Sequence, residues 1–153
     1  MHGDKNRIQV LNFQRKSIKD VEVLCKKNPP SLIVFDLLDA IQGFDKYLGG
    51  EGNTVERYGA LYQWSRIMAT EVCPVIAISQ LNRKGNDNCY PNMTELSGSG
   101  EKKQAAATCM IMIGSLEGDN AERYLSTPKN KISGDKSWRV KVKFDNLRSR
   151  FNT

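Results

Sequence analysis

The sequence predicts an α/β protein in which a mostly parallel central sheet is flanked by helices and followed by an antiparallel extension. Residues 31–36 (SLIVFD) and 74–80 (PVIAISQ) are apolar at nearly every position, which is typical of parallel strands covered on both faces. A stretch with helical spacing of apolar residues precedes each run, as expected for strands joined by helices. Residues 138–144 alternate between apolar and basic, which is typical of an antiparallel strand with one buried face.

The N-terminal part is expected to contain a short strand at residues 7–12 and a helix at 17–27. Ser17, followed three residues later by Asp20, forms a capping box, and the apolar residues after it recur at helical spacing. The Asn-Pro-Pro sequence at 28–30 ends this helix, because a residue before proline avoids the helical conformation. The first buried strand follows directly.

The middle of the chain alternates between loops and regular elements. A glycine-rich stretch at 42–53 predicts a loop, and Asn53 begins a helix that continues to about residue 71. The second buried strand follows at 74–80. Residues 81–100 are polar and irregular, and a loop of that length inside a compact domain is usually functional or disordered.

The C-terminal part is expected to form one short helix and several strands. The helix is predicted at 101–107, a third buried strand at 108–113, and further strands at 123–126, 138–144 and 148–151. The alternation at 138–144 places one face of that strand in the core and leaves the other face basic. A length of 153 residues suits a single domain with a sizeable core.

The composition is that of a globular protein. Hydrophobic residues make up 39% of the chain, and no apolar run approaches the ~20 residues needed to span a bilayer. The polar N-terminus contains no signal-peptide core, so we expect a cytoplasmic protein without a membrane partner. The cysteines form no Cys-x-x-Cys pair, which argues against a zinc site and favours reduced core thiols at Cys25, Cys73 and Cys109.

The net charge of +6 is consistent with a polyanionic partner such as nucleic acid or a nucleotide. The lysines and arginines crowd the last quarter of the chain, at residues 129–150. A basic surface that contacts only solvent is the alternative, and charge alone leaves both interpretations open.

Asp36 and Gln80 end the two buried strands. Sheets of this kind bind ligands at the carboxyl ends of their strands, so both side chains are expected at one crevice. An aspartate there can hold Mg²⁺ through water beside nucleotide phosphates, and a glutamine can bond a γ-phosphate or orient a water molecule. Either residue alone could be an ordinary turn or surface residue, but their pairing favours a nucleotide site.

Three strings in this order identify a family resemblance. They are LIVFD at 32–36, SQLNR at 79–83, and the pattern Leu-x-x-Ser-Gly-x-x-x-Gln-x-Ala at 96–106. With the apolar strand at 110–113 and the basic ending at 129–134, the chain resembles the RecA-like motor domain of the DnaB family of hexameric replicative helicases, bacteriophage primase-helicases included. The resemblance covers nearly the whole chain, but only the C-terminal portion of that P-loop NTPase core, from the Walker B strand to the finger region.

The resemblance implies part of an ATP-dependent DNA helicase that uses ATP, or another nucleoside triphosphate, and Mg²⁺. Asp36 would be the Walker B aspartate that positions Mg²⁺ through water, and Gln80 the sensor that links the γ-phosphate to the DNA loop. The implied partners are single-stranded DNA, identical subunits in a hexameric ring and a primase, in a bacterial or phage-infected cell. The residues implied to contact DNA are Arg83, Ser97, Gly98, Ser99, Gly100 and Lys102.

Glycines and lysines near residue 100 suit binding to a phosphate backbone. Glycines let backbone N–H groups approach phosphates closely, and phosphate contacts carry no sequence preference, as a translocating motor requires. Substitution of Lys102 or Lys103 by alanine is therefore expected to weaken binding of single-stranded DNA. A flexible linker that leads into a helix is the alternative for this stretch.

Lys129 and Lys131 stand where the family has a Lys-x-Arg pair that reaches the γ-phosphate of a neighbouring subunit. Lys131 thus occupies the position of an arginine finger, and lysine lacks the planar fork of arginine. Either Lys131 acts as a weaker finger, or another basic residue takes this catalytic role. Both lysines could also lie on a solvated turn.

The sequence also departs from the family pattern. A P-loop requires Gly-x-x-x-x-Gly-Lys-Ser/Thr, and this sequence contains no Gly-Lys dipeptide. Ser97 stands where a DNA-contacting arginine is common in the family. We therefore expect no ATP hydrolysis by this chain alone. A non-catalytic RecA-like module for nucleic-acid binding or interaction is the alternative function, and the SQLNR string disfavours a recombinase or clock-type relative.

Overall fold

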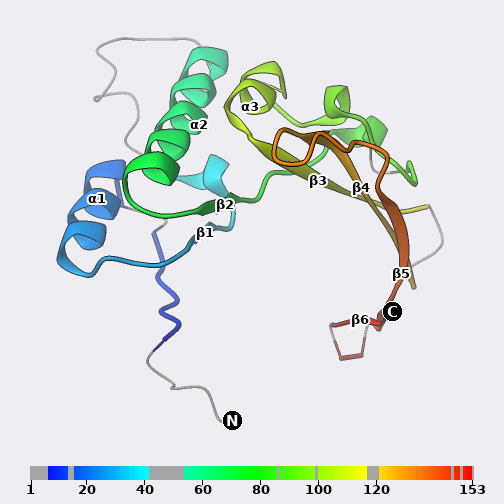
Figure 1. Cartoon of the computed structure of the whole chain (residues 1–153), viewed down its shortest axis with the longest axis horizontal. Helices are drawn as coiled ribbons and strands as arrows, with labels where there is room; N and C mark the ends of the chain where they lie inside the picture. The colour runs from blue at the N-terminus through cyan, green and yellow to red at the C-terminus, as the bar shows by residue number, and fades with distance from the viewer. Residues whose placement is uncertain are drawn as a thin grey trace.

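The computed structural model describes residues 7–13, 16–41, 54–85, 87–98, 100–116, 121–145, 147–148 and 150–152. In these residues the fold is α/β, with helices and strands in the order α1, β1, α2, β2, α3, β3, β4, β5 and β6 (Figure 1). The helices are α1 Ile18–Lys27, α2 Thr54–Glu71 and α3 Gly100–Ala106. The strands are β1 Ile33–Phe35, β2 Val75–Ala77, β3 Cys109–Gly114, β4 Glu122–Asn130, β5 Arg139–Asp145 and β6 Arg150–Asn152.

The strands form two sheets rather than one mostly parallel sheet. β1 and β2 pair in parallel, whereas β3, β4, β5 and β6 form an antiparallel sheet in that order. The prediction of a mostly parallel sheet is therefore wrong for the described residues. β3, predicted as a third buried strand of the parallel core, lies in the antiparallel sheet instead of beside β1 and β2. Its pairing with β4 is antiparallel because the connection over 115–121 is shorter than the dozen or more residues that a parallel crossover needs.

Helix α1 begins and ends where the sequence predicts. Ser17 is its N-cap, and the Asp20 carboxylate accepts hydrogen bonds from the Ser17 amide and hydroxyl at 2.7 and 3.0 Å. These bonds hold the pKa of Asp20 below its usual value, since they stabilise the charged form. The helix stops before Pro29, at the C-cap Asn28. Helix α2 likewise extends to Glu71 as predicted.

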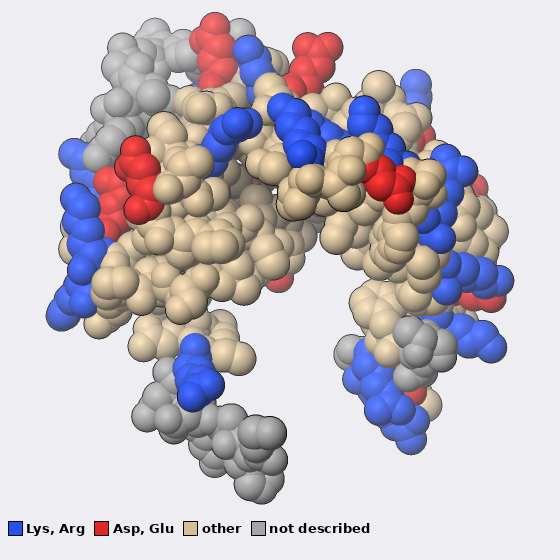
Figure 2. Space-filling model, in the orientation of Figure 1, with Lys and Arg blue, Asp and Glu red and all other residues tan. Residues whose placement is uncertain are grey.

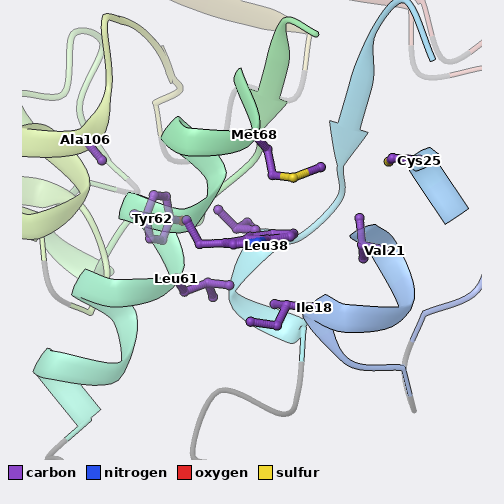
Figure 3. Packing of buried hydrophobic residues seen from close by; sticks show 9 residues of the cluster. Ile18, Val21, Cys25, Leu38, Leu61, Tyr62, Met68 and Ala106 are labelled. Atoms are coloured by element: carbon purple, nitrogen blue, oxygen red, sulfur yellow. The ribbon is translucent and has the colours of Figure 1, made fainter. Parts of the chain in front are cut away.

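One hydrophobic core lies between α1, α2 and the segment that follows β1. Leu38, in the short 3-10 turn η1 (Leu38–Ala40), is fully buried and lies between the side chains of α1 and α2 (Figure 3). Burying a side chain of this kind contributes about 1.5–3 kcal/mol. Burial of Leu38 thus fixes the η1 turn, and with it the position of Asp39. The buried members of the cluster are Ile18, Val21, Cys25, Leu38, Leu61, Tyr62, Trp64, Met68 and Ala106.

The parallel strands are covered on one face only. Val34 of β1 and Ile76 of β2 are 54% and 50% exposed, so the prediction of cover on both faces is wrong for the described residues. Residues 7–12 form no strand, contrary to the prediction, and with β1 they line a broad cavity of about 1050 Å³. Ile8 and Val10 of that segment are largely exposed.

The antiparallel sheet has a basic side, as the alternation along β5 predicts. Arg139, Lys141 and Lys143 are exposed, while Val140 and Val142 are half-buried. The chain turns back after β5 and pairs β5 with β6, which confirms the predicted return strand. No helix in the described part of the chain is long and apolar enough to cross a membrane.

Candidate functional site

Asp36 and Gln80 lie beyond the carboxyl ends of the two parallel strands. Phe35 pairs with Ala77, so Asp36 follows β1 directly and Gln80 follows β2 after two intervening residues. The amide of Ile78 donates to the Phe35 carbonyl at 3.0 Å, which continues the pairing past the strands. Both Asp36 and Gln80 are exposed. The structure therefore places the acid and the amide at the same edge of the sheet.

The stretch predicted to bind DNA is attached to the segment that carries Gln80. The Ser97 amide donates to the Gln80 carbonyl at 3.0 Å, and the neighbouring residues Leu81 and Leu96 form an antiparallel bridge. Gly98 has a φ of +65°, a conformation that side chains other than glycine rarely adopt. These contacts hold the start of the loop beside Gln80, at the end of the sheet where a nucleotide is expected to bind.

The other residues predicted to contact DNA differ in their exposure. Gly100 begins α3, and Arg83 and Lys102 are exposed. Ser99 lies outside the described residues. Lys103 is buried, with 2% of its side chain exposed, so a weaker binding of DNA in Lys103→Ala would act through the position of the loop rather than through a lost direct contact. In a helix, successive residues point in directions about 100° apart, so Lys102 faces solvent while Lys103 faces the interior.

The buried Lys103 joins the other elements of the site. Its Nζ donates to Asp39 Oδ2 and to Ser79 Oγ, both at 2.7 Å, and the Ser79 hydroxyl donates to the same carboxylate oxygen at 3.2 Å. The Asp39 side chain is 20% exposed. We call Lys103, Asp39 and Ser79 the lysine triad. A buried ammonium is tolerated only when paired and hydrogen-bonded, and these two partners supply both.

The lysine triad connects three segments that the sequence marks as functional. Asp39 lies in η1, three residues after Asp36, and Ser79 immediately precedes Gln80. Lys103 lies in α3, which follows the glycine-containing loop. A shift of any one segment therefore disturbs the hydrogen bonds of the other two. The sequence gives only weak signals for this group: an acid within the apolar string LLDAI and a serine at a strand end.

Two tyrosines of α2 cover the triad. The Lys103 ammonium lies 5.4 Å from the centre of the Tyr58 ring and 5.1 Å from that of Tyr62, at cation–π distances. Burial raises the pKa of Tyr62, an effect that the nearby Ser79 hydroxyl opposes. The Tyr62 hydroxyl and Asp39 Oδ1 are buried without hydrogen-bond partners in the described structure. The tyrosine rings, rather than further hydrogen bonds, complete the surroundings of the lysine.

The two lysines of the predicted finger have different environments. Lys129, in β4, donates from Nζ to the Gln104 carbonyl of α3, so its ammonium is held by its own chain. Lys131 is exposed in the turn after β4, and its amide donates to the Thr108 carbonyl at 3.0 Å. Lys131 is thus the better placed of the two to reach a ligand outside the molecule.

The residues at the sheet edge can supply part of a magnesium–nucleotide site. Asp36 offers one exposed carboxylate, which suits water-mediated contact with a Mg²⁺ ion held mainly by phosphates. Within the described residues, no three His, Cys, Asp or Glu side chains gather as a metal cage. The chain contains no Gly-Lys dipeptide to cradle the phosphates. These residues therefore fit a magnesium–nucleotide site that takes its other ligands from outside this sequence better than a site formed by this sequence alone.

The fold, the polar edge and the loop fastened beside it are features that a comparison with known families can test. A family described as the DnaB-like helicase C terminal domain matches residues 3–152. The chain belongs to this family. The predicted family resemblance is therefore confirmed, and it identifies the domain as the kind found in replicative helicase motors.

Two other comparisons say less about this DnaB-like domain. A crystal structure of the RadB recombinase matches with a TM-score of 0.49 and 14% identity, over 83% of this chain and 55% of RadB. The chain thus spans about half the length of that structure. No curated protein matches the sequence.

Proposed function

We propose that this DnaB-like domain is the C-terminal portion of an ATP-dependent replicative helicase motor, of the bacteriophage primase-helicase type. In this proposal residues 1–153 run from the Walker B strand to the finger region of a ring-forming protein in a bacterial or phage-infected cell. Asp36 positions Mg²⁺ through water, Gln80 senses the γ-phosphate, and the loop over 96–100 grips the backbone of single-stranded DNA. A phosphate-binding loop absent from this sequence completes the nucleotide site.

One observation carries the proposal: the loop and the sensor segment are a single connected unit. The Ser97 amide is bonded to the Gln80 carbonyl, and Lys103 bridges the segments of Asp39 and Ser79. A motor must change its grip on DNA when its nucleotide changes, and a short, hydrogen-bonded path between the two sites supports that requirement. The exposed Arg83 and Lys102 would add phosphate contacts.

A non-catalytic nucleic-acid-binding module is the second candidate. The absence of a Gly-Lys dipeptide favours it, because an ATPase of this class needs a lysine on the β- and γ-phosphates. Both candidates predict DNA binding by the loop. They differ in whether Asp36 and Gln80 respond to Mg²⁺–ATP, and a primase partner belongs to the first candidate only.

The experiment is a salt series of binding to fluorescently labelled oligo-dT of about 20 nucleotides, between about 50 and 200 mM salt. Lys102→Ala is expected to weaken binding uniformly across sequences and to reduce the salt slope by about 1. Lys26→Ala, which removes an exposed lysine in the last turn of α1, serves as the matched control.

Equal affinities for Lys102→Ala, the control and the unaltered chain would exclude DNA binding by this loop. A separate titration with Mg²⁺–ATP distinguishes the two candidates. A change in oligo-dT affinity that is lost in Asp36→Asn favours the motor. Because the phosphate-binding loop is absent from this sequence, an unchanged affinity of this chain alone agrees with both candidates. Ser97→Ala leaves the backbone contact to Gln80 in place and should bind nearly as well as the unaltered chain.

A further inference from the structure

One face of β5 carries a row of cations. Arg139, Lys141 and Lys143 occupy alternate positions of this strand, and all are exposed. Alternate residues of a strand lie on the same face of the sheet, roughly 7 Å apart, so the cations follow one another along that face. Figure 2 shows Lys and Arg side chains along the right-hand side of the view, where Figure 1 draws β5.

Two tyrosines lie against this row. Tyr124 of β4 pairs with Lys141, and residues paired across two strands share a face. The Lys141 ammonium lies 5.9 Å from the centre of the Tyr124 ring, and the Tyr124 and Tyr90 rings meet edge to face with their centres 5.6 Å apart. The Arg139 guanidinium lies over the Tyr90 ring, 5.0 Å from its centre. We call Tyr90, Tyr124, Arg139, Lys141 and Lys143 the β5 aromatic–basic face.

The segment around Tyr90 holds its ring in place. The Tyr90 amide donates to Asn88 Oδ1 at 3.0 Å, and Asn88 forms an antiparallel bridge with the residue that follows β3. The Asn88 carbonyl lies so close to Gly114 of β3 that no side chain would fit there. Pro91, directly after Tyr90, is fully buried. The ring is therefore positioned before any ligand binds.

The protein balances the charge of only one cation in the row. Lys141 Nζ lies 2.6 Å from Glu122 Oε1, and the Tyr124 hydroxyl donates to Oε2 of the same carboxylate at 3.0 Å. Among the described residues, neither Arg139 nor Lys143 forms an ion pair. Charged side chains also keep a free sheet edge from pairing with other chains, but that role does not require cations placed against aromatic rings.

We propose that the β5 aromatic–basic face binds single-stranded nucleic acid, with a base stacked on the Arg139 guanidinium and phosphates beside Lys141 and Lys143. A single strand exposes both flat bases and a row of negative charges. Bases stack on arginine planes as well as on aromatic rings, and Arg139 is exposed, so the guanidinium held over Tyr90 is open to a base. The lysines of the same row supply contacts that carry no sequence preference.

This face is separate from the loop over 96–100. The loop leads into α3, which stands beside α2 in Figure 1. β5 is separated from β3 by β4 and lies toward the other end of the molecule. The inference goes beyond the proposed function, since it uses neither the loop nor the sheet edge of Asp36 and Gln80. Either site can therefore fail without the other.

The first test measures the fluorescence anisotropy of labelled oligo-dT with the full chain at low salt. Arg139→Ala should weaken binding about tenfold, within the range for losing one stacked base. Arg139→Lys keeps the charge but loses the flat group, so it should weaken binding of oligo-dT and leave binding of an abasic oligonucleotide of the same length unchanged. Lys26→Ala on α1 is the matched control.

Two results of this test would overturn the proposal. Equal affinities of Arg139→Ala and the Lys26→Ala control for oligo-dT would show that no base stacks at this face. An equal loss of oligo-dT and abasic binding in Arg139→Lys would show that the face holds phosphates alone.

The Arg139 side chain packs on Tyr90, so a folding defect must be separated from loss of binding. Lys143→Ala provides this separation, because Lys143 is exposed and has no ion pair in the part of the chain that the structure describes. Its thermal unfolding should match that of the unaltered chain, while the salt slope of oligo-dT binding falls by about 1. An unchanged slope in a folded Lys143→Ala chain would contradict the proposed phosphate contact.

Two further comparisons identify the ligand and the site. Polyglutamate, an acidic chain without bases, should compete poorly with oligo-dT, and equal competition would assign the face to an acidic protein partner and overturn the proposal. If Arg139→Ala weakens oligo-dT binding and Lys102→Ala does not, the loop assignment fails while the β5 aromatic–basic face stands. The reverse result overturns the face and leaves the proposed function in place.

Discussion

Lys103 in α3 and the lysines at and after the end of β4 show two ways in which neighbouring parts of the molecule hold positive charge. Lys103 lies in α3 with 2% of its side chain exposed, and Asp39 and Ser79 satisfy its ammonium. After β4, Lys131 and Lys136 are exposed, and the one hydrogen bond of the Lys129 ammonium within the described residues goes to the backbone carbonyl of Gln104. The buried charge is balanced from inside the protein, and the exposed charges are not.

Because of this difference, the buried lysine is suited to positioning other segments and the exposed lysines are suited to binding a ligand. A buried ammonium must be neutralised before the chain can fold, so its partners are fixed and it cannot exchange them for a ligand. An exposed cation stays hydrated, so leaving it unpaired in the folded chain costs little free energy and it remains available to an anion. The lysine triad therefore holds the sheet edge and the loop together, whereas the lysines at and after the end of β4 are suited to a ligand from outside. Substitutions in the two groups should change the free energy of unfolding by different amounts and in opposite directions.

The largest effect is expected from Lys103→Met. Methionine matches the length of lysine but leaves Asp39 without its counter-charge, and breaking a buried ion pair typically costs about 3–5 kcal/mol. Asp39 is one-fifth exposed, so solvent recovers part of this cost, and we expect a loss of about 2–4 kcal/mol in the free energy of unfolding. Urea unfolding measures it, and a loss below about 0.5 kcal/mol, which is typical of surface sites, would contradict the structural role.

The second prediction removes both members of the pair. Asp39→Leu combined with Lys103→Met replaces the ion pair by apolar groups, an exchange that is often neutral or stabilising. We expect the double variant to recover most of the stability lost in Lys103→Met. The same unfolding experiment, set up as a double-mutant cycle with Asp39→Leu, measures the coupling. Additive losses would show that Lys103 and Asp39 do not act as a pair.

Tyr62→Phe should have a smaller effect of the opposite sign. It removes a buried hydroxyl that has no partner in the described structure, so stability should stay the same or rise by about 1 kcal/mol. Burial raises the pKa of Tyr62 in the folded state. The free energy of unfolding is therefore unaffected by its ionisation below the ordinary tyrosine pKa of about 10 and falls above it, where the unfolded chain loses the proton first. Unfolding followed between neutral and alkaline pH should show a smaller alkaline loss in Tyr62→Phe. Identical pH profiles would contradict the assigned cause.

The smallest effect is expected from Lys136→Ala. Removing one cation from the lysines at and after the end of β4 relieves repulsion, so the free energy of unfolding should change by no more than about 0.5 kcal/mol, in the stabilising direction. A urea series at low and high salt measures the change, which should shrink as salt screens these charges. A destabilisation comparable to that of Lys103→Met would remove the distinction between the two groups.

Local patterns in the sequence predicted much of the fold but not how the elements pair. The capping box at Ser17, the end of α1 and the strand ends at Asp36 and Gln80 depend on residues close in the chain. The lysine triad depends on a contact across 64 residues, which no local pattern encodes. The antiparallel pairing of β3 depends on the length of its connection, and its apolar composition suggested a parallel strand.

The candidate site was predictable to a similar extent. The family strings marked Gln80 and the loop after Leu96, and the structure connects them through the Ser97 amide. The difference between Lys102 and Lys103 could not be read from composition, because it depends on how a helix of 7 residues is rotated against α2. The contact between Tyr90 and Arg139 carried no signal at all, since the two residues meet only in the folded chain.

Hydrogen exchange at the Ser97 amide tests the central claim most directly, because this amide joins the loop to the Gln80 carbonyl. Addition of oligo-dT should slow exchange over 96–98 and leave β6 unchanged, and Lys103→Met should speed exchange at Ser97 and weaken the protection by DNA. Unchanged exchange over 96–98 at saturating oligo-dT would contradict the assignment of this loop as the DNA-binding element of the domain.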